Sequence, residues 1–320
     1  MEMAIQLLFL VLGFVMLVKG ADLFVDGASG IATKFGIPQI VIGLTIVAMG
    51  TSAPEAAVSI TAAFAGNADI TIGNIVGSNI LNILIILGIS ALVYPLAIQK
   101  STLIIDIPVV LLATVVLYLL GFDSNISRID GIIMLVVFAA YLFYLFTVAK
   151  KEASQKKLSE TTEHIQSEEN VTKEMSLLKA LIFTVIGLVL IVGGSKFVVN
   201  SATAIAKALG LSQRFIGLTI VALGTSLPEL FTSVTAALKK NSDIAIGNIV
   251  GSNIFNILFI VGLSGLIIPV PFATDFRFDT IISGVAAILL LLFCLPKKKL
   301  PRFAGAIMLI CYALYFMKIW

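Results

Sequence analysis

An internal duplication limits what this chain can fold into more than any other feature of its sequence. When the sequence is shifted by 174 residues, segment 36–95 aligns with 210–269 without a gap, and 38 of 60 positions are identical. A weaker match continues upstream, where the aligned pairs are Gly13 with Gly187, Gly20 with Gly194 and Ile31 with Ile205. The chain therefore consists of two homologous halves, residues 1–148 and 176–320.

The composition places both halves in a membrane. Of the 320 residues, 59% are hydrophobic and 12% are charged, whereas a soluble globular protein is roughly 45–50% apolar and about 25% charged. The apolar runs are long and unbroken, as in 84–92 and 281–295, which excludes the alternating pattern of a membrane β-barrel. A soluble enzyme is excluded, and we expect an all-α polytopic membrane protein.

The apolar runs predict ten transmembrane helices, five in each half. The predicted spans are 3–33, 38–65, 70–94, 103–121 and 130–148, followed by 177–207, 212–238, 244–268, 278–296 and 303–319. Because five is an odd number, the second half must enter the membrane from the opposite side. This arrangement is an inverted-topology repeat, which is common among secondary transporters.

The positions of the basic residues predict the orientation. With the N-terminus outside, the cytoplasmic connections hold thirteen Lys and Arg residues and the outer connections hold five, so the positive-inside rule favours N-out and C-out. Residues 149–175 carry five Lys and six acidic residues and are expected to form a solvated cytoplasmic linker. We expect a monomeric multi-pass protein of the cell membrane.

Other composition features point away from several functions. A net charge of +3 gives no reason to expect nucleic acid as a partner. The two cysteines, Cys294 and Cys311, lie in apolar runs, and with the one histidine, His164, they make neither a disulfide framework nor a zinc site.

The second span of each half carries a glutamate where a membrane helix should be apolar. The sequence Gly50-Thr-Ser-Ala-Pro-Glu55 is matched by Gly224-Thr-Ser-Leu-Pro-Glu229. A charge at the bilayer centre costs about 2.5–3.5 kcal/mol on insertion scales, so its duplication favours an ion or substrate path. Pro54 and Pro228 lack an N–H, and we expect them to free the carbonyls of Gly50 and Gly224 and to loosen those of Thr51 and Thr225.

The third spans supply further oxygen ligands. Asn74, Ser78 and Asn82 share one helix face, as do Asn248, Ser252 and Asn256. Glu55, Glu229, the carbonyls of Thr51 and Thr225, and the side chains of Ser52, Ser226, Ser78, Ser252, Asn82 and Asn256 together form a set of hard oxygen ligands. Such a set suits Ca²⁺ and disfavours zinc, copper and nickel. Two carboxylates balance one Ca²⁺ or two Na⁺.

Several other polar residues receive structural predictions. Asn74 and Asn248 are expected to form interhelical hydrogen bonds, and Asn79 and Asn253, which lie off the stripe, are expected to pack. Asp69 and Asp243 are expected to cap helices, and Asp106 to lie at the membrane interface. For Lys19, Asp22 and Asp26, the sequence leaves open a solvated helix end and a vestibule.

The duplicated G-T-S-x-P-E and G-N-I-V-G-S-N-I-x-N blocks resemble the α-repeats of the cation/calcium exchanger superfamily, and are most similar to those of prokaryotic sodium/calcium exchangers. The resemblance covers the whole chain. It implies ten helices in two inverted halves, with the first helix of each half sliding to gate access. It also implies a Ca²⁺ site of Glu55, Glu229 and the carbonyls of Thr51 and Thr225, with Asn82 and Asn256 lining the middle.

The resemblance further implies two flanking Na⁺ sites. One comprises Ala48, Thr51, Ser52, Glu55 and Ser78, and the other comprises Ala222, Thr225, Ser226, Glu229 and Ser252. Some archaeal members carry Asp where this chain has Asn256. That departure leaves the coupling ion open, because a buried glutamate can also take up a proton.

We therefore expect a secondary active antiporter that moves Ca²⁺ outward against inward Na⁺ by alternating access, without a cofactor and without enzymatic activity. The nearest alternative is an H⁺/Ca²⁺ or K⁺-assisted exchanger of the same superfamily. A cation channel is disfavoured by the inverted repeats and the single carboxylate pair. An intramembrane hydrolase is disfavoured because no histidine accompanies the membrane serines.

Overall fold

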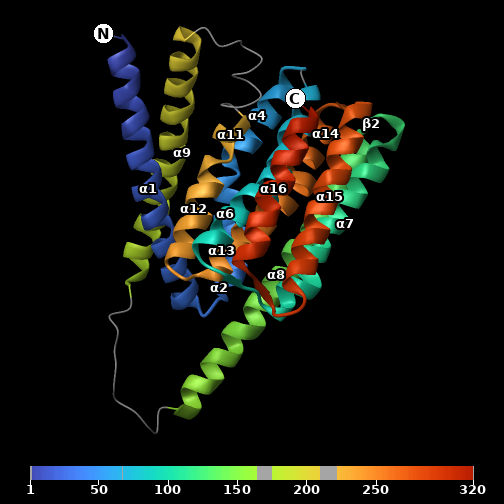
Figure 1. Cartoon of the computed structure of the whole chain (residues 1–320). Coiled ribbons are helices and arrows are strands. Elements are labelled where there is room, and N and C mark those ends of the chain that lie inside the picture. The colour runs from blue at the N-terminus through green and yellow to red at the C-terminus, as the bar shows by residue number, and fades with distance from the viewer. Residues whose placement is uncertain (1, 67, 164–174, 210–221, 320) are drawn as a thin grey trace.

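The chain is almost entirely helical, as its long apolar runs predict. The computed structural model describes residues 2–66, 68–163, 175–209 and 222–319. The helices of the first half are α1 (Glu2–Phe35), α2 (Gln39–Ile42), α3 (Ala48–Thr51), α4 (Ala53–Phe64), α5 (Asp69–Leu81), α6 (Gly88–Val93), α7 (Ile107–Leu120) and α8 (Arg128–Glu163). Those of the second half are α9 (Leu177–Ala208), α11 (Ala222–Thr225), α12 (Leu227–Leu238), α13 (Ser242–Ile254), α14 (Gly262–Ile267), α15 (Thr274–Cys294) and α16 (Arg302–Ile319) (Figure 1).

Short helical segments of other kinds interrupt or extend these α-helices. Among the described residues, four are π-helical: η1 (Gly43–Val47), η2 (Asn82–Leu87), η3 (Thr102–Asp106) and η6 (Phe255–Val261), and η4 (Gly121–Asp123) is a 3₁₀ turn. A π turn widens the backbone and often marks a functional position in a helix. Two of these segments, η2 and η6, directly follow α5 and α13.

Seven helical stretches in the described ranges are long and apolar enough to cross a membrane, or eight if the bent pair Gln39–Thr51 and Ala53–Phe64 counts as one span. The seven stretches and the bent pair together correspond to eight of the ten predicted spans. The other two predicted spans contain α12 and α16, although 210–221 falls outside the described ranges. The polytopic membrane fold is therefore confirmed, and the number ten remains a prediction.

Helix α8 continues past the predicted end of its span. The apolar run predicts that the span ends at 148, but the helix runs on to Glu163, so the first part of the expected linker is helical. Lys, Glu, Gln and Ala are good helix formers, which explains how a polar sequence extends a membrane helix. The remainder of the linker, 164–174, lies outside the described residues.

Helices α1 and α9 run antiparallel along one side of the molecule (Figure 1). The glycines that the duplication aligns lie at their contact. A Cβ on Gly13 would lie 2.9 Å from the carbonyl oxygen of Gly194, and a Cβ on Gly20 would lie 2.9 Å from that of Gly187. Small residues thus let the two backbones touch.

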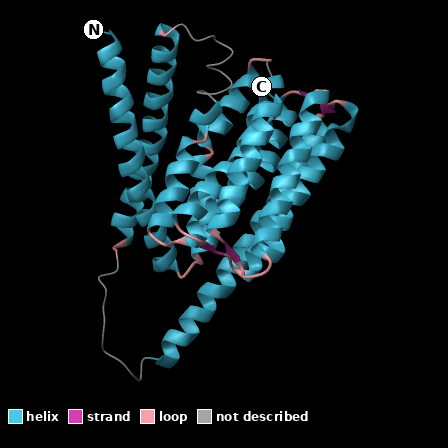
Figure 2. Ribbon diagram, in the orientation of Figure 1, coloured by secondary structure: helices cyan, strands magenta, loops and turns pink. Residues whose placement is uncertain are grey.

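Two short antiparallel strand pairs tie the halves together. Strand β1 (Leu96–Ala97) pairs with β4 (Lys299–Leu300), and β2 (Asn125–Ile126) pairs with β3 (Val270–Pro271). Under the 174-residue alignment, β1 corresponds to β3 and β2 to β4. The two ladders are therefore equivalents of each other, and Figure 2 shows them at opposite ends of the bundle.

The centre of the molecule is formed by α5 and α13 with the π segments that follow them. The spans that contain these helices are the most buried of the seven. Gly247 and Gly251 of α13 lie directly against η1. A Cβ added to Gly247 would be 2.9 Å from the Cα of Gly43, and one added to Gly251 would be 2.6 Å from the carbonyl oxygen of Leu44. This close packing brings the polar face of α13 against the broken helix of the first half.

Candidate ion-binding site

Each glutamate lies in the first turn of a helix that begins at a break. Helix α3 ends at Thr51 and α4 begins at Ala53, with Ser52 between them and a bend of 50°. Pro54 occupies the start of α4, where its missing N–H costs least. The second half repeats this arrangement, with Ser226 between α11 and α12.

The prolines are expected to free the carbonyls of Gly50 and Gly224. At the first break, the backbone N–H of Ser52 donates to the carbonyl of Ala48 at 3.0 Å, and the release of the Gly50 carbonyl stays a prediction. At the second break, the carbonyl of Gly224 accepts a hydrogen bond of 2.6 Å from the hydroxyl of Ser195 in α9.

The two carboxylates are buried and held by serines of the opposite half. Glu55 and Glu229 are each 1% exposed. The hydroxyl of Ser52 donates to Oε1 of Glu229 at 2.8 Å, and that of Ser226 donates to Oε1 of Glu55 at 3.2 Å. The duplication therefore forms a reciprocal site, in which each break supplies one carboxylate and one hydroxyl.

Four buried oxygen atoms on the two glutamates and on the π segments that pack against the glutamate helices have no hydrogen-bond donor. They are Oε2 of Glu55, Oε2 of Glu229, Oδ1 of Asn82 and Oδ1 of Asn256. Buried polar atoms in native proteins nearly always have a partner, and four acceptors without donors at repeat-related positions suit a cation that binds through oxygen. In the described part of the chain, no cluster of three or more His, Cys, Asp or Glu residues is present, so the negative charge here comes from two carboxylates.

The remaining predicted ligands lie around these atoms. Ser78 lies 3.5 Å from Oε1 of Glu55 and 3.3 Å from the hydroxyl of Ser226. The carbonyl oxygen of Ala48 lies 3.3 Å from the hydroxyls of both Ser252 and Thr51. These contacts bring ligands of the two halves together.

Thr51 and Thr225 each end the helix that precedes a break, and Ala222 begins α11. Thr225 is half-buried, whereas Thr51 is fully buried. The hydroxyl of Thr51 also donates to Oδ1 of Asn248 at 2.9 Å.

Asn74 and Asn248 hold the glutamate helices, as predicted. The amide of Asn74 donates to the carbonyl of Glu55 at 3.3 Å, and that of Asn248 donates to the carbonyl of Glu229 at 3.4 Å. Each amide also donates to a serine one turn further on, at 3.0 Å to Ser59 and 2.9 Å to Ser233.

The family of the chain follows from comparison with known proteins. A family model described as sodium/calcium exchanger protein matches residues 5–147 and 179–320. The chain belongs to the sodium/calcium exchanger family. The resemblance noted from the duplicated motifs is therefore confirmed.

Relatives of this exchanger-family chain match it over most of its length. The sodium/calcium exchanger MaX1 of Methanosarcina acetivorans is 34% identical over 343 residues, covering 97% of each chain. The inner membrane protein YrbG of Escherichia coli is 36% identical over 285 residues, covering 88% of this chain and 87% of that protein. A solved structure of the sodium-calcium exchanger NCX_Mj, soaked with 2.5 mM Na⁺ and 0.1 mM Sr²⁺, superposes with a TM-score of 0.84 at 31% identity and covers 98% of this chain and 99% of that one.

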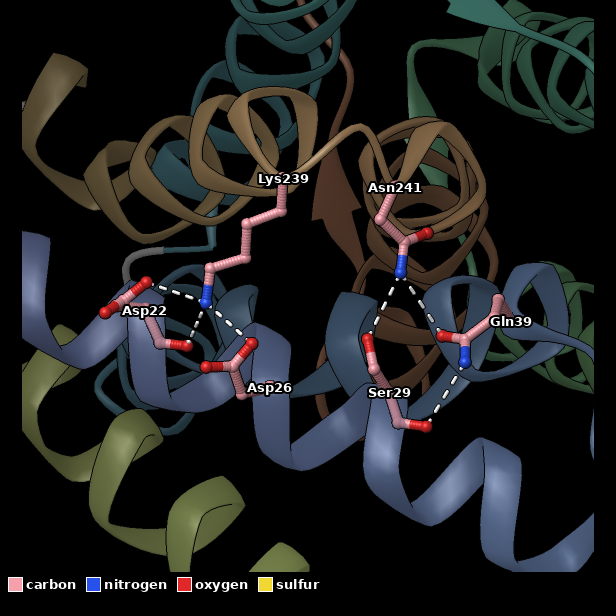
Figure 3. A network of polar contacts seen from close by, with 6 residues as sticks. All are labelled: Asp22, Asp26, Ser29, Gln39, Lys239 and Asn241. Carbon is pink, nitrogen blue, oxygen red and sulfur yellow. Dashed lines mark hydrogen bonds and ion pairs between the residues drawn. The ribbon is translucent and has the colours of Figure 1, made fainter. Parts of the chain in front are cut away.

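One end of this exchanger fold carries a polar network that the sequence did not define (Figure 3). Lys239, at the end of α12, lies 2.7 Å from carboxylate oxygens of both Asp22 and Asp26 on α1. Nearby, the amide of Asn241 donates to Ser29 at 3.1 Å and to Gln39 at 3.3 Å. The two aspartates therefore connect α1 to the turn between α12 and α13.

The predicted cap at Asp243 is wrong. The side-chain oxygen of Asn241 caps α13 by accepting from the backbone N–H of Ile244 at 3.1 Å. Because the helix begins at Ser242, Asn241 occupies the N-cap position and Asp243 lies inside the first turn. Asp243 instead accepts from Gln99 at 2.7 Å. The side chain of Asp69 lies outside what the structure describes.

Asp106, which is predicted to lie at the membrane interface, is buried inside the protein. Its side chain is 2% exposed and accepts a hydrogen bond of 3.0 Å from the hydroxyl of Tyr141 on α8. The second half contains a similar pair, because Tyr315, which aligns with Tyr141, donates to Asp279 at 3.0 Å. The tyrosine partner is 35 residues away in sequence, so the local pattern around Asp106 could not indicate this burial.

Proposed function

We propose that this protein is a secondary active antiporter that exchanges Ca²⁺ for Na⁺ at a single central site between its two halves. The observation that carries the proposal is the set of four buried acceptors without donors on Glu55, Glu229, Asn82 and Asn256. Carboxylate and amide oxygens are the ligands that Ca²⁺ prefers, and Ca²⁺ needs six to eight of them. The hydroxyls of Ser52 and Ser226 and the carbonyls of Thr51 and Thr225 would complete the shell.

The charge of the site favours exchange over leak. Two carboxylates without a cation are costly to hold away from water. The empty carrier should therefore resist the change between its inward-facing and outward-facing states. One Ca²⁺ or two Na⁺ neutralise the pair. We therefore propose that the carrier changes access with cargo bound, moving Ca²⁺ outward while Na⁺ moves inward.

Sodium would use ligands from each break separately. One proposed site comprises Ala48, Thr51, Ser52, Glu55 and Ser78, and the other comprises Ala222, Thr225, Ser226, Glu229 and Ser252. The contacts of Ser78 with Glu55 and Ser226, and of Ser252 with the Ala48 carbonyl, support this grouping. Because Ca²⁺ and Na⁺ would share both glutamates, binding of one ion would displace the other.

The proposed topology has ten membrane helices in two inverted repeats, with both termini outside and the linker in the cytoplasm of a cell-membrane protein. Equivalent strand pairs at opposite ends of the bundle support the inversion. Antiparallel packing of α1 on α9 supports their role as a sliding pair that gates access. The ion pairs of Lys239 would then hold α1 at the cytoplasmic end.

The experiment is Ca²⁺ uptake into proteoliposomes loaded with Na⁺ and diluted into Na⁺-free buffer. Uptake should follow the outward Na⁺ gradient and stop when the gradient is collapsed. Matched vesicles with a K⁺ or a pH gradient alone should take up little Ca²⁺. Uptake driven by the pH gradient instead would favour the H⁺/Ca²⁺ alternative, and gradient-independent uptake with single-channel currents would favour a channel.

A further inference from the structure

Four asparagines at the centre of the molecule form a closed network, which we call the asparagine clasp: Asn79, Asn82, Asn253 and Asn256. Each is at most 1% exposed. The amide nitrogen of Asn79 donates to the backbone carbonyl of Asn253 at 3.1 Å, and that of Asn253 donates to the backbone carbonyl of Asn79 at 3.2 Å. The predicted packing role of Asn79 and Asn253 therefore misses their main contacts, which cross between the two halves.

These contacts fix which way the amides of Asn79 and Asn253 face. A backbone carbonyl can only accept, so the NH₂ group of Asn253 must face Asn79, and its Oδ1 must face the other way. That Oδ1 accepts from the NH₂ group of Asn82 at 3.0 Å. In the same way, Oδ1 of Asn79 accepts from the NH₂ group of Asn256 at 3.1 Å.

The free oxygens of the ion site follow from this orientation. Once the NH₂ groups of Asn82 and Asn256 are occupied, their Oδ1 atoms must point away from the clasp, and both are buried without a donor. Segment η2, which begins at Asn82, packs against α12, which carries Glu229, and η6 packs against α4, which carries Glu55. The inner asparagines thus lie on the segments that face the glutamate helices.

We propose that Asn79 and Asn253 are positioning residues that hold Asn256 and Asn82, respectively, with oxygen rather than NH₂ toward the bound cation. The proposal rests on the ion site described under the proposed function. An asparagine released from the clasp can rotate by 180° and present a donor, which repels a cation and can bind a carboxylate in its place. The affinity for the cation then falls, because the amide donor occupies a carboxylate oxygen that would otherwise bind the cation.

Calorimetric measurement of Ca²⁺ binding to purified protein tests the proposal in three backgrounds. In the unaltered background, Asn253→Ala should raise the Kd for Ca²⁺ about tenfold or more, the scale of a hydrogen bond to a charged group. In the Asn82→Asp background both terminal atoms are oxygen, so the same change should raise Kd less than about threefold. In the Asn256→Asp background, which is the matched control, Asn253→Ala should keep its full effect, because Asn79 holds Asn256.

The mirror cycle provides a second test if Asn253→Ala does not fold. Asn79→Ala should raise the Kd for Ca²⁺ in the unaltered protein and in the Asn82→Asp background. In the Asn256→Asp background the same change should have little effect on Kd. If the alanine change raises the Kd for Ca²⁺ by the same factor in all three backgrounds, the positioning role is overturned and Asn79 and Asn253 are packing residues. Binding does not require coupled transport, so failure of Na⁺ coupling in the unaltered protein would overturn the proposed function without deciding these ratios.

Discussion

The hydroxyl of Ser52 lies 2.8 Å from Oε1 of Glu229, so a residue at the helix break of the first half holds the carboxylate of the second. The reverse contact joins Ser226 to Glu55 at 3.2 Å. Each carboxylate is therefore tied to the opposite break. Displacement of one half relative to the other must rearrange both halves of the site together.

Ser52→Ala and Ser226→Ala should impair exchange by similar amounts. Each removes a donor to a buried carboxylate and a proposed Na⁺ ligand. A hydrogen bond to a charged group is worth about 1.5–3 kcal/mol, so the Na⁺ concentration for half-maximal exchange should rise about tenfold or more. Ca²⁺ uptake at graded internal Na⁺ measures this, and a normal Na⁺ dependence in either variant would contradict the reciprocal site.

Gly194→Ala should destabilise the contact between α1 and α9. The new Cβ would lie 2.8 Å from the carbonyl oxygen of Gly13 and 3.0 Å from the backbone nitrogen of Leu17, and such overpacking costs about 1–3 kcal/mol. Unfolding in detergent measures the loss. Gly193→Ala is the matched control, because its Cβ would meet only the flexible end of Met16, at 3.2 Å, and equal losses in both variants would refute the close packing.

Tyr141→Phe should lower stability because it leaves the buried Asp106 without the hydroxyl that donates to it at 3.0 Å. The expected loss in unfolding free energy is about 1–3 kcal/mol. Tyr144→Phe, on the same helix but less buried, should cost less. Replacing both partners, as in Asp106→Leu with Tyr141→Phe, should recover part of the loss, and a fully additive double variant would argue against the pair.

Lys239→Gln should weaken the attachment of α1 in a salt-dependent way. It removes two ion pairs of 2.7 Å, and exposed pairs are worth about 0.2–1 kcal/mol each. The difference in thermal stability from the unaltered protein should be largest at low salt and should shrink near 1 M, where the Debye length is about 3 Å. Lys240→Gln serves as the control, and a salt-independent difference would mean that Lys239 acts through packing.

The burial of both glutamates could be predicted from the sequence, because each lies inside an apolar run and the two positions match in the duplication. The sequence also predicted the hydrogen-bonding role of Asn74 and Asn248, since a straight α-helix places them on the face that meets the glutamate helices. These successes depend on local pattern and on the repeat alone.

The roles of Asn79 and Asn253 could not be predicted in the same way. A face drawn at a spacing of four residues assumes a regular α-helix, but π-helical segments begin at Asn82 and at Phe255 and change which residues share a face. The clasp also depends on contacts between residues 171 to 177 positions apart. The same limit applies to Lys239, whose acidic partners lie on α1.

Na⁺-driven Ca²⁺ uptake by Glu55→Gln and Glu229→Gln tests the central claim most directly, with the exposed Glu152→Gln as the matched control. Either site variant loses one of the two negative charges and a proposed ligand for Ca²⁺. The account predicts that each abolishes uptake while Glu152→Gln transports like the unaltered protein. Near-normal uptake by either site variant would contradict a central site shared by the two halves.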